Sequence, residues 1–302
     1  MFSFFREEIL GVEAYGKLPL AKDYLRVGCA EGTPALWRKW LDAGYSGGSG
    51  GAFPALSGAL RFTTGSVWGE PLVGLLWPSS DAGGLRKFPL TLVVERRAKP
   101  ARADAAAGFP VARALWRELE ALKRTGEARP DGAAFLGALR GRELDVQALA
   151  PVQGERFDFG SFEAAYAALD GGLVGLLRKL AELRRSGPRA VLRLPLAANL
   201  DLVEQAHGWL SLCSDLGLLH GTDSPAVYFP ADAPAEGAPA ALVLATRPFQ
   251  AADVAWLAPL GTSRLGPEDL AQPVRLEAPI VRESSLPLAT TLAACWQAKL
   301  GR

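Results

Sequence analysis

Large apolar residues recur at helical spacing in several stretches of the chain. Between residues 111 and 124 they fall on one stripe while charged residues lie opposite, which predicts an amphipathic helix. The stripe consists of Leu115, Trp116, Leu119 and Leu122. Similar spacing predicts helices over 162–169, 173–183, 199–219, 251–257 and 289–299. A further helix is predicted over 34–41, because Thr33 suits the N-cap and Pro34 the first helical position.

Short apolar runs bounded by turn residues predict strands. They cover 59–64, 72–77, 88–95, 190–196, 225–230 and 240–246. Because these strands alternate with helices, the sequence predicts an α/β fold, a three-layer α/β/α sandwich with a mixed sheet. The pattern is interrupted between Arg142 and Phe157. We therefore expect an N-terminal α/β region at 1–150 and a C-terminal α/β region at 151–302, packed into the same body.

The composition fits a protein with a large buried core. The chain has 302 residues, 49% of them hydrophobic, and a formal net charge of +1, which gives no long-range field towards nucleic acid. No apolar run reaches the roughly 18 residues that a membrane span needs. The N-terminal residues MFSFFREEILGVEAYGK lack the basic start and cleavage site of a signal peptide. We expect a cytoplasmic protein with no nucleic-acid partner and no membrane insertion.

Groups that could support catalysis or bind a metal are few. Cys29, Cys213 and Cys295 are far apart and form no CxxC pair, so we expect reduced, buried thiols and no metal site. His207 and His220 lie 13 positions apart, too far to share a metal within one helix. We expect His207 to pack on its helix and His220 to lie at the helix C-terminus, where a cation is favourable.

Two sequence patterns resemble known catalytic or binding motifs, but each lacks an essential residue or spacing of the motif. Ser224, His220 and Asp223 are crowded into five positions and lack the elbow around a nucleophilic serine. Residues 11–17 approach a phosphate-binding loop, but Leu18 stands where the magnesium-binding Ser or Thr belongs and Pro19 would break the following helix. We expect no enzyme, no cofactor and no small-molecule substrate, with a small hydrolase using His220 as one alternative.

A series of short motifs runs through the first hundred residues. In order, they are Tyr15-Gly16-Lys17-Leu18-Pro19, Asp23-Tyr24-Leu25-Arg26, Trp37-Arg38-Lys39-Trp40-Leu41, Arg61-Phe62, Leu75-Leu76-Trp77-Pro78-Ser79 with Asp81, and Arg86-Lys87-Phe88-Pro89-Leu90-Thr91. In this order and spacing they resemble the TagF family, also called ImpM, accessory proteins of the bacterial type VI secretion system. The resemblance covers residues 11 to 95 and is faint near 224 to 246. Lys22 departs from it, because the family usually has glycine there.

The resemblance implies regulation without catalysis. Members of the family act as post-translational repressors of type VI secretion, through the scaffold protein of the apparatus that carries a forkhead-associated domain. We therefore expect a non-enzymatic cytoplasmic repressor that binds this scaffold. A structural assembly factor of the secretion apparatus is the second alternative.

The polar motif residues lie in turns or at element ends, which can converge on one edge of a sheet. The residues expected to bind a partner there are Lys17, Asp23, Arg26, Ser79, Asp81, Arg86 and Lys87. The remaining motif residues are Tyr15, Gly16, Leu18, Pro19, Trp37, Trp40, Phe62, Trp77, Pro78, Phe88 and Pro89. A purely structural reading stays open, in which Gly16 and Pro19 shape a turn, Asp81 closes another and Asp23 pairs with Arg26.

Overall fold

Most of the chain is described by a computed structural model. It covers residues 9–46, 56–65, 69–96, 109–129, 131–146, 159–166, 172–186, 191–197, 200–215, 225–232, 240–245, 247 and 250–257. The N-terminal region contains β1 (Ile9–Gly16), β2 (Leu25–Val27), α1 (Gly32–Ser46), β3 (Leu60–Thr63), β4 (Leu72–Trp77), β5 (Leu90–Glu95), α2 (Phe109–Glu127), α3 (Gly132–Leu139) and β6 (Glu143–Asp145). The C-terminal region contains α4 (Phe159–Ala165), α5 (Gly172–Ser186), β7 (Val191–Leu196), α6 (Leu202–Asp215), β8 (Ala226–Pro230), β9 (Ala240–Ala245) and the 3-10 helix η2 (Ala251–Trp256).

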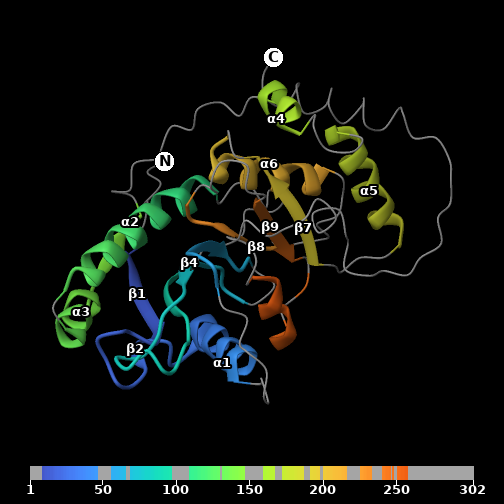
Figure 1. Cartoon of the computed structure of the whole chain (residues 1–302). Helices are drawn as coiled ribbons and strands as arrows, with labels where there is room; N and C mark the ends of the chain where they lie inside the picture. The colour runs from blue at the N-terminus through green and yellow to red at the C-terminus, as the bar shows by residue number, and fades with distance from the viewer. Residues whose placement is uncertain are drawn as a thin grey trace.

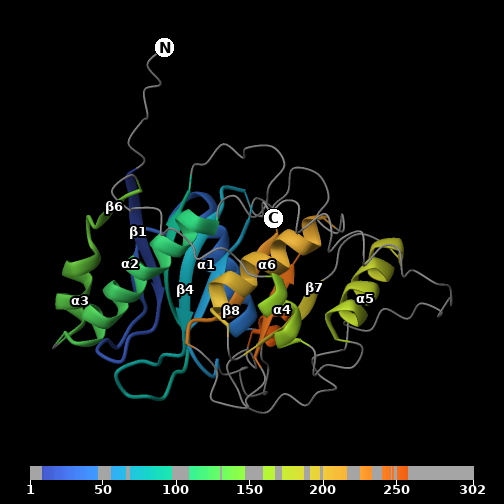
Figure 2. The same ribbon diagram turned by 90° about the horizontal axis from the view of Figure 1, so that it is seen from above.

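The strands form one sheet in the order β2-β1-β5-β4-β3-β8-β9-β7, and β6 also pairs with β1. Figure 2 shows these strands side by side from β1 to β7. Strands β3 and β8 pair directly, with Leu60 opposite Pro230 and Thr63 opposite Val227. The regions 1–150 and 151–302 therefore contribute to the same sheet, while the expected division near residue 150 stays a prediction.

Every strand pair within the described residues is antiparallel. The α/β class is thus confirmed, but the expected mixed sheet is wrong, and the three-layer sandwich stays a prediction. The physical reason lies in the connections. A loop joins β4 to β5, and a loop that returns the chain to a neighbouring strand makes the pair antiparallel.

Side chains that alternate along the strands divide the core between the two faces of the sheet. On β4, Val73, Leu75 and Trp77 belong to the cluster that contains the α2 side chains. Leu72 and Leu76 belong to a second cluster with Trp37 and Trp40 of α1. In Figure 1, α2 and α6 accordingly lie over one face of the sheet, with α1 and η2 on the other.

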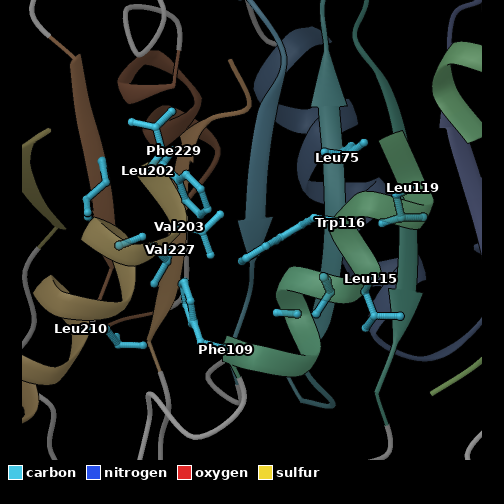
Figure 3. Close-up of a cluster of buried hydrophobic side chains, with 14 of the residues drawn as sticks. Leu75, Phe109, Leu115, Trp116, Leu119, Leu202, Val203, Leu210, Val227 and Phe229 are labelled. Atoms are coloured by element: carbon cyan, nitrogen blue, oxygen red, sulfur yellow. The ribbon is translucent and has the colours of Figure 1, made fainter. Parts of the chain in front are cut away.

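The first cluster joins the two regions of the chain. Figure 3 shows Leu115 and Trp116 of α2 close to the strands and Leu202 and Val203 of α6 beside β8. The indole Nε1 of Trp116 donates to the carbonyls of Phe62 and Gly74, both at 3.1 Å. This buried donor is therefore satisfied by the backbone of the sheet.

The helices at 34–41, 111–124, 173–183 and 199–219 and the strands at 59–64, 72–77, 88–95, 190–196, 225–230 and 240–246 are confirmed, with shifted ends in most cases. The helix expected at 162–169 begins and ends earlier, as α4, and the one at 251–257 is a 3-10 helix. The helix expected at 289–299 lies outside the described residues. Strands β1, β2 and β6 and helix α3 were not predicted.

Candidate functional site

Two motifs of the sequence meet where β1 ends. Gly16 lies opposite Leu90 in the pairing of β1 with β5. Its φ is +138°, and a Cβ atom there would lie 2.1 Å from the carbonyl oxygen of Pro89. Only glycine allows this backbone approach. The Gly-Lys-Leu-Pro and Phe-Pro-Leu-Thr motifs are therefore two sides of one contact.

Asp81 organises the loop between β4 and β5. Its Oδ1 accepts the N–H groups of Leu85 and Arg86, at 3.1 and 3.3 Å, and its Oδ2 accepts Nε of Arg86 at 2.6 Å. The hydrogen bonds from Arg86 hold the pKa of the Asp81 carboxyl below its ordinary value. Asp81 thus closes the loop, as the structural reading of its motif expects.

The same loop is fastened to the segment that follows β1. The N–H of Ala82 donates to the carbonyl of Ala21 at 3.0 Å. The carbonyl of Lys22 accepts Nη2 of Arg86 at 2.8 Å and Nζ of Lys17 at 3.3 Å. Two cationic side chains therefore share one neutral oxygen.

Aromatic rings fill the space between these segments. Tyr24 stacks on Tyr15 with centroids 5.6 Å apart and meets Phe88 edge-on at 5.0 Å. The Nζ of Lys17 lies 4.1 Å from the centroid of Tyr24, within range of a cation–π interaction. The hydroxyl of Tyr15 donates to Asp42 Oδ1 of α1 at 2.5 Å. Burial, followed by the bond to Asp42, raises the pKa of Tyr15.

Exposed side chains of these two segments form what we call the loop surface. It consists of Pro19, Leu20, Lys22, Asp23, Tyr24, Arg26, Leu85, Arg86 and Lys87. Leu85 is 89% exposed, an unusual state for a leucine. A groove of about 450 Å³ runs between residues 20–25 and the start of α3, where Asp131, Gly132, Ala133 and Leu136 line it.

The structure brings the expected partner-binding residues to one end of the sheet but in different states. Asp23, Arg26, Arg86 and Lys87 are exposed, and Ser79 is half-buried. Lys17 and Asp81 are buried, which places them beneath the surface. These residues lie where β1 and β4 end and in β2. In the sheet, β2 pairs with β1, and both β1 and β4 pair with β5. Their role in binding stays a prediction.

The pairing of Asp23 with Arg26 is not present. Arg26 lies in β2 and its Nε donates to the carbonyl of Gly28 at 3.2 Å. Asp23 precedes the strand in an irregular segment, so the two residues do not share a helical turn.

The remaining motif residues are placed by the core and by the turns. Trp37, Trp40, Phe62 and Phe88 are buried on the α1 face of the sheet, and Leu18 and Trp77 on the α2 face. Pro89 is buried beside Gly16, and Pro78 is exposed at the start of the loop. These motif residues therefore shape the framework beneath the loop surface.

Sequence reasoning missed three exposed apolar members of the loop surface as functional candidates. These are Leu20, Tyr24 and Leu85, whose apolar side chains in the sequence are typical of buried positions. The available signal was an apolar residue between Gly84 and Arg86, in a loop where a buried position is not expected.

Candidate catalytic groups are sparse in the described part of the chain. There, no group of three or more His, Cys, Asp and Glu side chains could hold a metal ion. Cys29 and Cys213 are buried, as expected, and burial is the main cause that raises the pKa of each thiol to about 12. His207 stacks on Phe109 with centroids 5.8 Å apart, which fits the expected packing role. His220, Asp223, Ser224 and Cys295 lie outside the described residues.

No helix among the described residues is both long and apolar enough to cross a membrane.

Comparisons with known proteins agree with the sequence motifs. Residues 13–139 match the family described as TagF N-terminal domain, Type VI secretion system-associated. No curated protein matches the chain. Among solved structures, the crystal structure of PA0076 from Pseudomonas aeruginosa PAO1 is similar, with 18% identity and a TM-score of 0.41, over 89% of this chain and all of that one. The match begins within β1 and runs to the end of α3, so it contains the whole loop surface. Residues 13–139 of this chain therefore match a domain family whose description associates it with the type VI secretion system.

Proposed function

We propose that the protein is a non-enzymatic, cytoplasmic, post-translational repressor of type VI secretion. It acts by binding the scaffold protein of the apparatus that carries a forkhead-associated domain, and it binds through the loop surface. The family match supports a role in this secretion system. The observation that carries the choice of surface is Leu85, an 89% exposed leucine on a loop held by part-buried hydrogen bonds.

A rigid loop suits protein recognition. Asp81 fixes the loop internally, and the bonds from Ala82 and Arg86 fix it to residues 21 and 22. Little conformational entropy is then lost when a partner covers Leu85, so more of the contact energy appears as affinity.

Charge on the loop surface favours an acidic partner. Lys22, Arg26 and Lys87 are exposed and have no ion pair to a described residue, whereas Arg86 is bound to Asp81. Asp23 is the one exposed acid of the loop surface. This excess of cations would speed the encounter with an acidic surface and select against basic ones.

The test is a charge placed on the exposed leucine. Leu85→Asp should weaken scaffold binding about 30-fold, the effect of losing a hot-spot residue. Leu36→Asp is the matched control, since Leu36 is 48% exposed on α1, away from the loop surface. Isothermal titration calorimetry with the purified scaffold measures both, beside thermal melts. Equal affinities of the two folded variants would exclude this surface.

Secretion assays separate repression from the alternatives. Deletion of the gene should raise type VI secretion, and the Leu85→Asp variant should fail to restore repression. Loss of secretion on deletion would instead support an assembly factor. His220→Ala should repress normally, and a folded His220→Ala protein without function would support a hydrolase.

A further inference from the structure

Lys17, which directly follows β1, is a lysine that is only 1% exposed. An ammonium group carries three N–H donors and no acceptor. In the described part of the chain, the neighbours of Nζ are the Lys22 carbonyl at 3.3 Å and the face of Tyr24 at 4.1 Å. No described carboxylate lies within 4 Å of Nζ. A buried charge without a counter-ion is unusual.

The acids around Lys17 are engaged elsewhere. Asp81 is bound to Arg86, and Asp42 accepts the hydroxyl of Tyr15. Asp23 is exposed, and its field acts on Arg86. Arg86 adds a second positive charge, because its Nη2 binds the same Lys22 carbonyl as Lys17. The charge of Lys17 is therefore without direct compensation.

We propose that Lys17 is a receptor for an acidic side chain of the partner, covered in the free protein by the ring of Tyr24. The inference rests on the proposed binding of a protein at the loop surface. A glutamate or aspartate of the partner approaches from the loop surface, displaces the Tyr24 ring and places its carboxylate between Lys17 Nζ and Arg86 Nη2.

The position of Tyr24 supports this route. Tyr24 is 45% exposed, it lines the groove, and it lies in an irregular segment between β1 and β2. The side chain can therefore rotate away without breaking a helix or strand. A carboxylate in its place would form charge-assisted hydrogen bonds in a partly desolvated position, where they are stronger than at an open surface.

Peptide binding tests the receptor without the scaffold. The probes are a short oligoglutamate peptide and an oligoglutamine peptide of equal length, each with a fluorescent label for anisotropy. Lys17→Met keeps the length of the side chain and removes its charge, and it should weaken oligoglutamate binding about tenfold, as the loss of one charge-assisted hydrogen bond does. The control Lys39→Met removes an exposed charge on α1, outside the loop surface, and should change binding about twofold. Equal effects of the two substitutions, or equal binding of the two peptides, would overturn the proposal.

Chemical labelling of Lys17 itself tests the proposal even if the Lys17→Met variant does not fold. Acetylation by an N-hydroxysuccinimide ester, followed by mass spectrometry, should modify Lys17 far more slowly than the exposed Lys22 and Lys87. Tyr24→Ala should accelerate labelling of Lys17, and the oligoglutamate peptide should slow it again. Labelling of Lys17 that the peptide leaves unchanged would refute the receptor.

The outcomes distinguish this inference from the proposed function. If the peptide protects Lys17 but the scaffold does not bind, the proposed function fails and the receptor stands. If the scaffold binds the wild-type protein and folded Lys17→Met equally well, the receptor fails and the proposed function stands.

Discussion

Replacement of Gly16 by alanine should force β1 away from β5 at the base of the loop surface. The added Cβ would lie 2.1 Å from the Pro89 carbonyl oxygen and 2.7 Å from Cα of Leu90. Both atoms belong to the backbone, so no side chain can rotate to make room. The φ of +138° is a further obstacle, because alanine rarely adopts it.

The size of the effect follows from these two contributions. A non-glycine residue in such a conformation costs about 1–3 kcal/mol, and overpacking costs about 1–3 kcal/mol. Alanine restricts the unfolded chain more than glycine, which offsets about 0.4–1 kcal/mol. The expected loss is about 3 kcal/mol, which lowers the Tm of a large domain by about 6–12 °C.

Gly11→Ala is the matched control, since Gly11 lies in the same strand and a Cβ there meets nothing within 4 Å. It should change the Tm by less than about 2 °C. Scanning calorimetry of the two variants measures the difference. If Gly16→Ala and Gly11→Ala had the same Tm, the argument that the β1–β5 contact requires glycine would be refuted.

Three further perturbations probe the interior. In Asp81→Asn, the urea midpoint should depend less on pH on the acid side. The pKa of Asp81 is lower in the folded than in the unfolded protein, so the carboxylate stabilises the fold above the unfolded-state pKa. That stability is lost as the pH falls through the folded-state pKa. Gln205→Leu should destabilise the fold by about 3 kcal/mol in urea titration. The carboxamide of the buried Gln205 bonds to Tyr166, to both backbone groups of Ala197 and to the Leu200 carbonyl. An unchanged midpoint would contradict that account. At neutral pH, iodoacetamide should modify the peptides of Cys29 and Cys213 only after unfolding, because the pKa of each buried thiol is about 12.

Local patterns predicted the strongly apolar elements well and the interrupted ones poorly. β4 was predicted with its observed bounds, because a continuous apolar run marks a strand buried on both faces. β1 was missed although Leu10, Val12 and Ala14 alternate with Gly11 and Glu13. Gly11 and Gly16 instead match the glycine spacing of a phosphate-binding loop. The antiparallel pairing needed the order of strands in space, which one sequence does not contain.

The candidate site was only partly predictable. The order of the motifs indicated which segments converge, and Asp81 was recognised as a residue that can close a turn. The burial of Lys17 could not be inferred, because a lysine beside glycine and proline resembles an exposed turn residue. It is covered by Tyr24, whose position depends on stacking with Tyr15 and Phe88.

The pairing of β3 with β8 has a consequence for synthesis on the ribosome. The edge of β3 that β8 covers stays unpaired until the chain has grown by more than half its length. At typical translation rates this takes roughly 10–30 seconds. During that interval the nascent chain presents an open β-strand edge close to Phe62 and Trp37, the feature that promotes association between chains. Efficient production should therefore depend on chaperones that shield this edge, and fragments that end before β8 should aggregate.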